Sequence, residues 1–87
     1  MSGKIKDTFL ETLTKNEDKI FHLVVTTNSK DEEKMKSTLI DTGVKIRYSF
    51  VEDSIIFTME ATGKQALKLL SLEFISYMRE MMVAHVC

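Results

Sequence analysis

Two kinds of residue periodicity alternate between positions 20 and 80, and their order constrains the fold more than any other feature. Apolar residues recur at every second position, or fill short β-rich runs, at 20–27, 44–50, 55–61 and 74–79. Stripes typical of amphipathic helices lie between the first and second of these runs, and between the third and fourth. The resulting order is strand, helix, strand, strand, helix, strand.

This order predicts an α+β fold. Each half is a strand, a crossover helix and a strand, and such crossovers are right-handed almost without exception. Two interleaved units form a ferredoxin-like βαββαβ sandwich, in which a four-stranded antiparallel sheet carries two helices on one face. We expect one such domain over residues 20–80, because 87 residues leave no room for a second.

Capping signals place the two helices. Ser29 stands three positions before Glu32, which is the capping-box spacing and predicts a helix over about residues 30–42. Gly43 follows its last turn, where a residue with positive φ is favoured. The same spacing at Thr62–Gln65 marks the start of the second helix.

The two ends of the chain flank this domain. Residues 1–19 are expected to form an N-terminal helical extension, because Ile5, Phe9 and Leu13 recur at helical spacing and predict a short helix within 3–16. Residues 81–87 have no Gly, no Pro and no helical stripe, so we expect an extended, apolar C-terminal tail.

The second strand has the clearest alternation in the chain. Its apolar residues Val44, Ile46, Tyr48 and Phe50 alternate with Lys45, Arg47 and Ser49. RNA-binding sheets stack bases on aromatic residues beside basic ones, and this strand offers such a pair. We favour the other interpretation, in which the two aromatic residues belong to the core and the arginine is solvated.

The sheet is expected to expose an apolar face. Helices cover only one side of it, and apolar residues occur on both sides of the first, third and fourth strands, as at Ile56 and Phe57 or at Phe74 and Ile75. An exposed apolar sheet face usually marks an interaction surface. The sequence therefore predicts a protein-binding face opposite the helices.

Composition argues against several classes of function. The net charge of −1, with no run of five like charges, lacks the clustered cations that bind nucleic acid. No apolar run approaches the roughly 20 residues that span a bilayer. The first residues lack the pattern of a signal peptide. We expect neither a nucleic-acid nor a membrane partner, and a cytoplasmic location unless the chain is an excised propeptide, which would be secreted.

Residues with catalytic or metal-binding chemistry are sparse. His22 and His85 lie far apart, and Cys87 is the only cysteine, so we expect no metal site. The three glycines are isolated, which argues against a phosphate-binding loop. His85 and Cys87 lie on the tail, where a nucleophile and its base lack a fixed geometry. We expect no catalytic residue, no cofactor and no enzymatic activity.

Three segments between Phe21 and Cys87 together resemble the propeptide domains of subtilisin-family serine proteases and the free-standing inhibitors related to them. Gly43-Val-Lys-Ile-Arg-Tyr-Ser-Phe50 is similar to the second strand common in that family. Gln65-Ala-Leu-Lys-Leu-Leu70 and Phe74-Ile-Ser-Tyr77 are similar to its final helix and fourth strand. Met82-Val-Ala-His-Val-Cys87 closely resembles the ending of some bacterial subtilisin propeptides, at the same distance from the strand.

The resemblance implies an inhibitor, and a folding chaperone, of a subtilisin-like serine protease. In that family the open sheet face docks on two surface helices of the protease, and the tail lies along the substrate groove like an uncleaved product. Carried over by position, the protease-binding tail is Val83, Ala84, His85, Val86 and Cys87, and the docking rim is Arg79, Glu80 and Met81.

Within this tail, the resemblance assigns Cys87 to the primary specificity pocket and Ala84 to the small apolar pocket three residues upstream. An extended peptide in a groove gains main-chain hydrogen bonds, and its tether to a folded domain lowers the entropy lost on binding. The expected partner is therefore a subtilisin-like protease, and the free protein is expected to be a monomer.

Two features depart from the family. Acidic residues often follow the fourth strand there, whereas Arg79-Glu80-Met81 has one carboxylate and one cation. A larger residue than Cys87 is also common at the last position. Two other functions remain open: a ferredoxin-like oligomerisation or regulatory module that acts through its apolar face, and a small enzyme or RNA binder.

Overall fold

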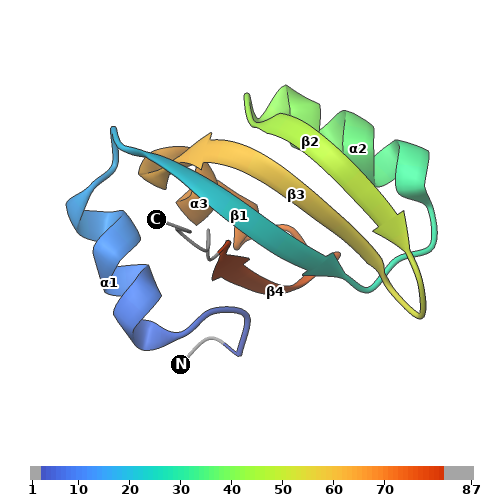
Figure 1. Cartoon of the computed structure of the whole chain (residues 1–87), viewed down its shortest axis with the longest axis horizontal. Helices are drawn as coiled ribbons and strands as arrows, with labels where there is room; N and C mark the ends of the chain where they lie inside the picture. Colours follow the sequence, from blue (N-terminus) through green and yellow to red (C-terminus); the bar gives the residue numbers. More distant parts are fainter. Residues whose placement is uncertain (1–2, 82–87) are drawn as a thin grey trace, which may run out of the picture.

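The computed structural model describes residues 3–81, which form a four-stranded antiparallel sheet and three helices (Figure 1). The helices are α1 (Asp7–Lys15), α2 (Glu32–Asp41) and α3 (Gly63–Leu69). The strands are β1 (Ile20–Thr27), β2 (Lys45–Val51), β3 (Ile55–Thr62) and β4 (Ile75–Glu80). The predicted α+β class and the order of the elements are confirmed.

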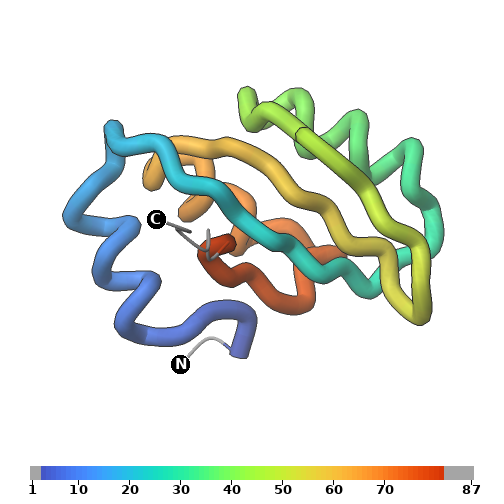
Figure 2. The backbone as a smooth tube through the Cα atoms, in the orientation of Figure 1, coloured from blue at the N-terminus to red at the C-terminus, as the bar shows by residue number. Residues whose placement is uncertain are grey.

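The strands lie in the order β2-β3-β1-β4, and every neighbouring pair is antiparallel. Figure 2 shows the last strand running beside the first, far from it in the sequence. The parallel strands β1 and β2 are separated by β3, and the parallel strands β3 and β4 are separated by β1. Each strand-helix-strand unit is therefore split by one strand of the other unit.

All three helices bury apolar side chains in one core, against one face of the sheet. Phe21, Leu23 and Val25 alternate along β1 and are at most 3% exposed. They share one cluster with residues of β3, β4 and the helices: Phe57, Met59, Met78, Leu13, Met35, Leu39, Ala66 and Leu69. Figure 1 shows α2 and α3 behind the sheet in this view. Burial of these side chains is the main stabilising term.

The N-terminal residues are part of this core. The predicted helix begins only at Asp7, and Ile5 precedes it in a non-helical segment while remaining 4% exposed. The carbonyl oxygen of Lys4 accepts a 2.7 Å hydrogen bond from the Met78 N–H on the outer edge of β4. The Lys4 ammonium donates to the carbonyl oxygen of Leu72 at 2.8 Å, beyond the end of α3.

The end of α1 and the start of α3 are in close contact. The Gly63 N–H donates to the carbonyl oxygen of Lys19, and the Lys64 N–H donates to that of Glu17, both at 3.0 Å. A Cβ at Gly63 would meet the carbonyl oxygens of Asn16 and Leu13, the latter at 2.7 Å. Real Cβ atoms do not approach neighbours so closely, so this position requires glycine.

The helix caps agree with the sequence prediction at α3 and differ at α2. Thr62 and Gln65 form a reciprocal capping box, and Gly43 has a φ of 93°. The cap of α2 is Asp31, whose carboxylate accepts from the Lys34 N–H at 3.1 Å. Ser29 accepts from the Asp31 N–H instead, so the capping box expected at Ser29 is wrong.

A β-bulge in β2 reverses the direction of its aromatic side chains. Ile46 pairs with the core residue Met59, but Tyr48, two positions later, pairs with the next residue, Thr58. Arg47 is the extra residue, so the alternation shifts by one at this point. Tyr48 is 65% exposed and Phe50 is 49% exposed. The interpretation of both as core aromatics is therefore wrong.

No helix within residues 3–81 is long and apolar enough to cross a membrane.

Candidate protein-docking face

One face of the sheet points away from the helices. We call this surface the open face, and it comprises Ile20, His22, Val24, Thr26, Lys45, Tyr48, Phe50, Ile56, Thr58, Glu60, Thr62, Tyr77 and Arg79. These residues alternate with core residues along each strand, as Val24 does with Leu23 and Val25. Alternate side chains of a strand point to opposite faces, so the open face follows directly from the register.

The register arranges the open face in rows across the four strands. One row is Tyr48, Thr58, Val24 and Arg79, in the order β2-β3-β1-β4. The next row is Phe50, Ile56, Thr26 and Tyr77. Paired residues of antiparallel strands have neighbouring side chains. The two rows therefore combine aromatic and aliphatic residues with one cation, Arg79, at the β4 end.

A groove of about 500 Å³ crosses this face. Its lining residues are Val24, Phe50, Glu52, Ile56, Thr58, Arg79 and Met81. The walls are mainly apolar, and Phe50 and Ile56 are accessible to a partner. Thr58 is only 6% exposed, and among residues 3–81 its hydroxyl oxygen has no hydrogen-bond partner. Such a surface favours apolar contacts with a protein partner over binding of a polar small molecule.

Few charged groups of the open face are paired. Arg47 and Glu60 form an ion pair with an N–O distance of 2.9 Å at one end of the rows. The other ion pair found in residues 3–81, Lys15–Glu11, lies on α1. Arg79 belongs to neither pair and is exposed. Its guanidinium is therefore available to a partner.

The structure divides the predicted docking rim between two sides of the molecule. Arg79 pairs with Val24 and belongs to the open face. Met81 lines the groove, and its N–H donates a 2.8 Å hydrogen bond to the carbonyl oxygen of His22. Glu80 pairs with the core residue Leu23 and lies on the helix side of the sheet. Only the first and last rim residues can contact a partner at the open face.

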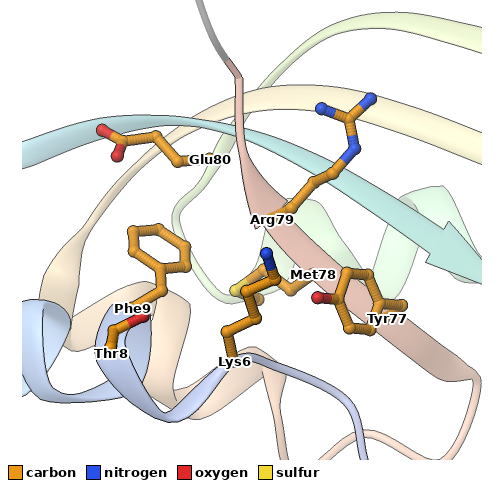
Figure 3. Close-up of a pocket in the computed structure, with 7 residues that line it drawn as sticks. All are labelled: Lys6, Thr8, Phe9, Tyr77, Met78, Arg79 and Glu80. Atoms are coloured by element: carbon orange, nitrogen blue, oxygen red, sulfur yellow. The ribbon is translucent and has the colours of Figure 1, made fainter.

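A separate cavity of about 400 Å³ lies between α1 and β4 (Figure 3). Its lining residues are Lys6, Thr8, Phe9, Tyr77, Met78, Arg79 and Glu80. In Figure 3 the guanidinium of Arg79 and the carboxylate of Glu80 point in different directions. The charged groups do not converge on one point, as an acid–base pair would require.

The predicted protease-binding tail, Val83, Ala84, His85, Val86 and Cys87, lies outside the described residues.

Within the described part of the chain, no three His, Cys, Asp or Glu side chains are grouped so that they can hold a metal ion. Comparisons of the chain with protein-family models, with curated proteins and with solved structures found no match.

Two residues of the open face were not predicted from the sequence. Tyr48 and Phe50 were assigned to the core, and the β-bulge places them on the outside instead. The only signal in the sequence was their position beside Arg47, which also suits a solvated strand. Val24 and Ile56 lie on the open face, as the two-sided apolar pattern of their strands predicted, and Val24 is 9% exposed.

Proposed function

We propose that this protein inhibits a subtilisin-like serine protease and assists its folding, with the open face docking on the enzyme and the tail placed in the substrate groove like a product. The observation that carries the proposal is that the open face continues directly into the tail. Strand β4 belongs to the open face, and the hydrogen bond from the Met81 N–H to the carbonyl oxygen of His22 keeps the chain on the sheet up to the first tail residue.

The open face is too small to form a stable interface by itself, which favours a partner that also binds the tail. Three strand spacings of about 4.8 Å and six residues at about 3.3 Å give roughly 290 Å² of flat area. Two such surfaces bury less than the roughly 1,200 Å² of a stable interface. A tail bound in a groove adds main-chain hydrogen bonds and further buried area. Tight inhibition therefore requires both parts.

The tail has the length that this role needs. Six residues, 82–87, extend about 20 Å when fully stretched, which exceeds the roughly 14 Å of three strand spacings. An extended segment of this length reaches from a docking site beside the active centre into the active centre itself. The assignments of Cys87 to the primary pocket and of Ala84 to the pocket three residues upstream remain part of this proposal.

The charge of the open face constrains the docking site on the protease. Arg79 lies on the open face at the end of β4 and forms no ion pair within residues 3–81, and Glu80 lies on the opposite side of the sheet. A cation is stabilised by carboxylates or by the carbonyl oxygens at a helix C-terminus. The cognate protease therefore presents negative potential to Arg79. Acidic rim residues, as in the family that the sequence resembles, would instead cap helix N-termini of the protease.

The fold assignment also belongs to this proposal. We assign the domain to the ferredoxin-like sandwich, because both of its βαβ units are split by a strand of the other unit. Folds of this architecture serve many functions, so the assignment is compatible with an inhibitor and does not by itself support one.

The proposal is tested with a panel of subtilisin-like proteases and the residual activity of each after incubation with the protein. We expect slow or tight inhibition of at least one enzyme, and a loss of at least about 100-fold in affinity when residues 83–87 are deleted. Circular dichroism and unfolding in urea verify that the deletion variant is folded. Absence of inhibition at micromolar protein, or equal inhibition by the deletion variant, would contradict the proposal.

A further inference from the structure

The open face is complementary to a second copy of itself. Two copies can be placed with their open faces in contact and related by a twofold axis. This axis lies in the plane between the two sheets, parallel to the strands and midway between β3 and β1. This axis places β2 of one copy over β4 of the other, and β3 over β1, because the strand order is β2-β3-β1-β4. The residues of one row then face the same row of the second copy in reverse order, as an isologous contact requires.

This arrangement pairs an exposed aromatic residue of each copy with an exposed cation of the other. Tyr48 of each copy faces Arg79 of the other, so the same contact forms twice, once at each end of the row. Between these contacts, Thr58 of each copy faces Val24 of the other. A guanidinium over a tyrosine ring forms a cation–π contact. Tyr48 is 65% exposed, and Arg79 takes part in no ion pair within residues 3–81, so both are free to form it. The apolar side chains of Phe50 and Ile56 lie in the next row.

We propose that two copies of the chain associate through their open faces in this twofold-symmetric arrangement. The net charge of −1 causes little repulsion between the copies. The flat area of the two faces, roughly 570 Å² in total from the strand spacing, is below that of a stable interface. The dimer is therefore weak and reversible, and the protein is a monomer when dilute.

Self-association has a consequence for inhibition that rests on the proposed function. The dimer covers the same residues that the protease would contact, so a chain cannot bind a second copy and the enzyme at the same time. Concentrated protein is then a reserve of masked inhibitor, which dilution releases.

Substitutions of opposite charge at Tyr48 test the arrangement. Sedimentation equilibrium from micromolar to millimolar concentration gives the dissociation constant of the dimer. We expect Tyr48→Arg to raise it at least about tenfold, because two pairs of cations then face each other, and Tyr48→Glu to leave it unchanged or lower it. In an Arg79→Ala background the difference between the two variants should disappear.

Ile40 provides the matched control. It is 55% exposed and lies on α2, on the other side of the sheet. Ile40→Arg and Ile40→Glu therefore change the net charge by the same amounts as the two Tyr48 variants, but leave the open face unchanged. Neither should alter the dissociation constant. A monomeric mass up to millimolar concentration, or equal effects of the two Tyr48 variants, would overturn the proposal. These measurements use no protease, so their failure is distinct from a failure of inhibition.

Discussion

The hydroxyl of Thr27 donates a hydrogen bond of 2.7 Å to the carbonyl oxygen of Ile55, and it joins the end of β1 to the start of β3 inside the core. We expect Thr27→Val to lower the free energy of unfolding by about 1–2 kcal/mol, because the substitution leaves a buried carbonyl oxygen without this donor. Unfolding in urea, monitored by circular dichroism, measures the change. An unchanged midpoint would show that this bond adds nothing to stability.

Thr58 is the natural counterpart, because its hydroxyl oxygen is buried and has no hydrogen-bond partner among residues 3–81. Valine has the same shape and places a methyl group where the hydroxyl was. We expect Thr58→Val to raise the free energy of unfolding by about 1 kcal/mol, because the desolvated polar group is removed. The same unfolding experiment compares both threonines, and the prediction fails if the two variants shift the midpoint in the same direction.

Gly63 connects α1 to α3, and a methyl group at this position would collide with backbone carbonyl oxygens. We expect Gly63→Ala to destabilise the protein by about 1–3 kcal/mol, because backbone neighbours have to move apart. Thermal unfolding measures the loss. Gly3→Ala is the control, since nothing lies within 4 Å of a Cβ at Gly3, and it should change the midpoint very little.

The two polar residues before α2 make a further comparison. Asp31 caps the helix with a hydrogen bond to the Lys34 N–H, whereas Ser29 accepts only from the Asp31 N–H in the preceding loop. Asp31→Ala should cost about 1 kcal/mol of unfolding free energy, the usual value for a lost N-cap. Ser29→Ala should cost less. The reverse ranking in urea unfolding would restore Ser29 as the cap.

The order of strands and helices was predictable because it depends on local periodicity. Apolar spacing identified every strand of the sheet, and the capping box at Thr62–Gln65 marked the start of α3. The start of α1 was not predictable, because Ile5 continues the apolar stripe but lies in a segment bonded to the edge of β4. That hydrogen bond joins residues far apart in the sequence, and no local pattern reports it.

The open face was predictable only in outline. Its apolar character follows from two-sided apolar strands, but the direction of Tyr48 and Phe50 depends on the β-bulge at Arg47. A bulge is set by pairing with the neighbouring strand, so the alternation within β2 alone gives the wrong face. The same principle separates Arg79 from Glu80, which a strand places on opposite sides.

Phe50 tests the assignment of the open face to protease docking. The side chain is 49% exposed and lines the groove, so Phe50→Ser should change the stability of the free protein by less than about 1 kcal/mol. It should weaken inhibition at least about tenfold, because an exposed aromatic side chain that becomes buried on binding contributes a large apolar contact area. Ile40→Ser is the matched control, because this exposed apolar residue lies on α2. Inhibition constants of both variants against the same protease measure the effect. If both lose affinity equally, or neither does, the enzyme docks on another surface.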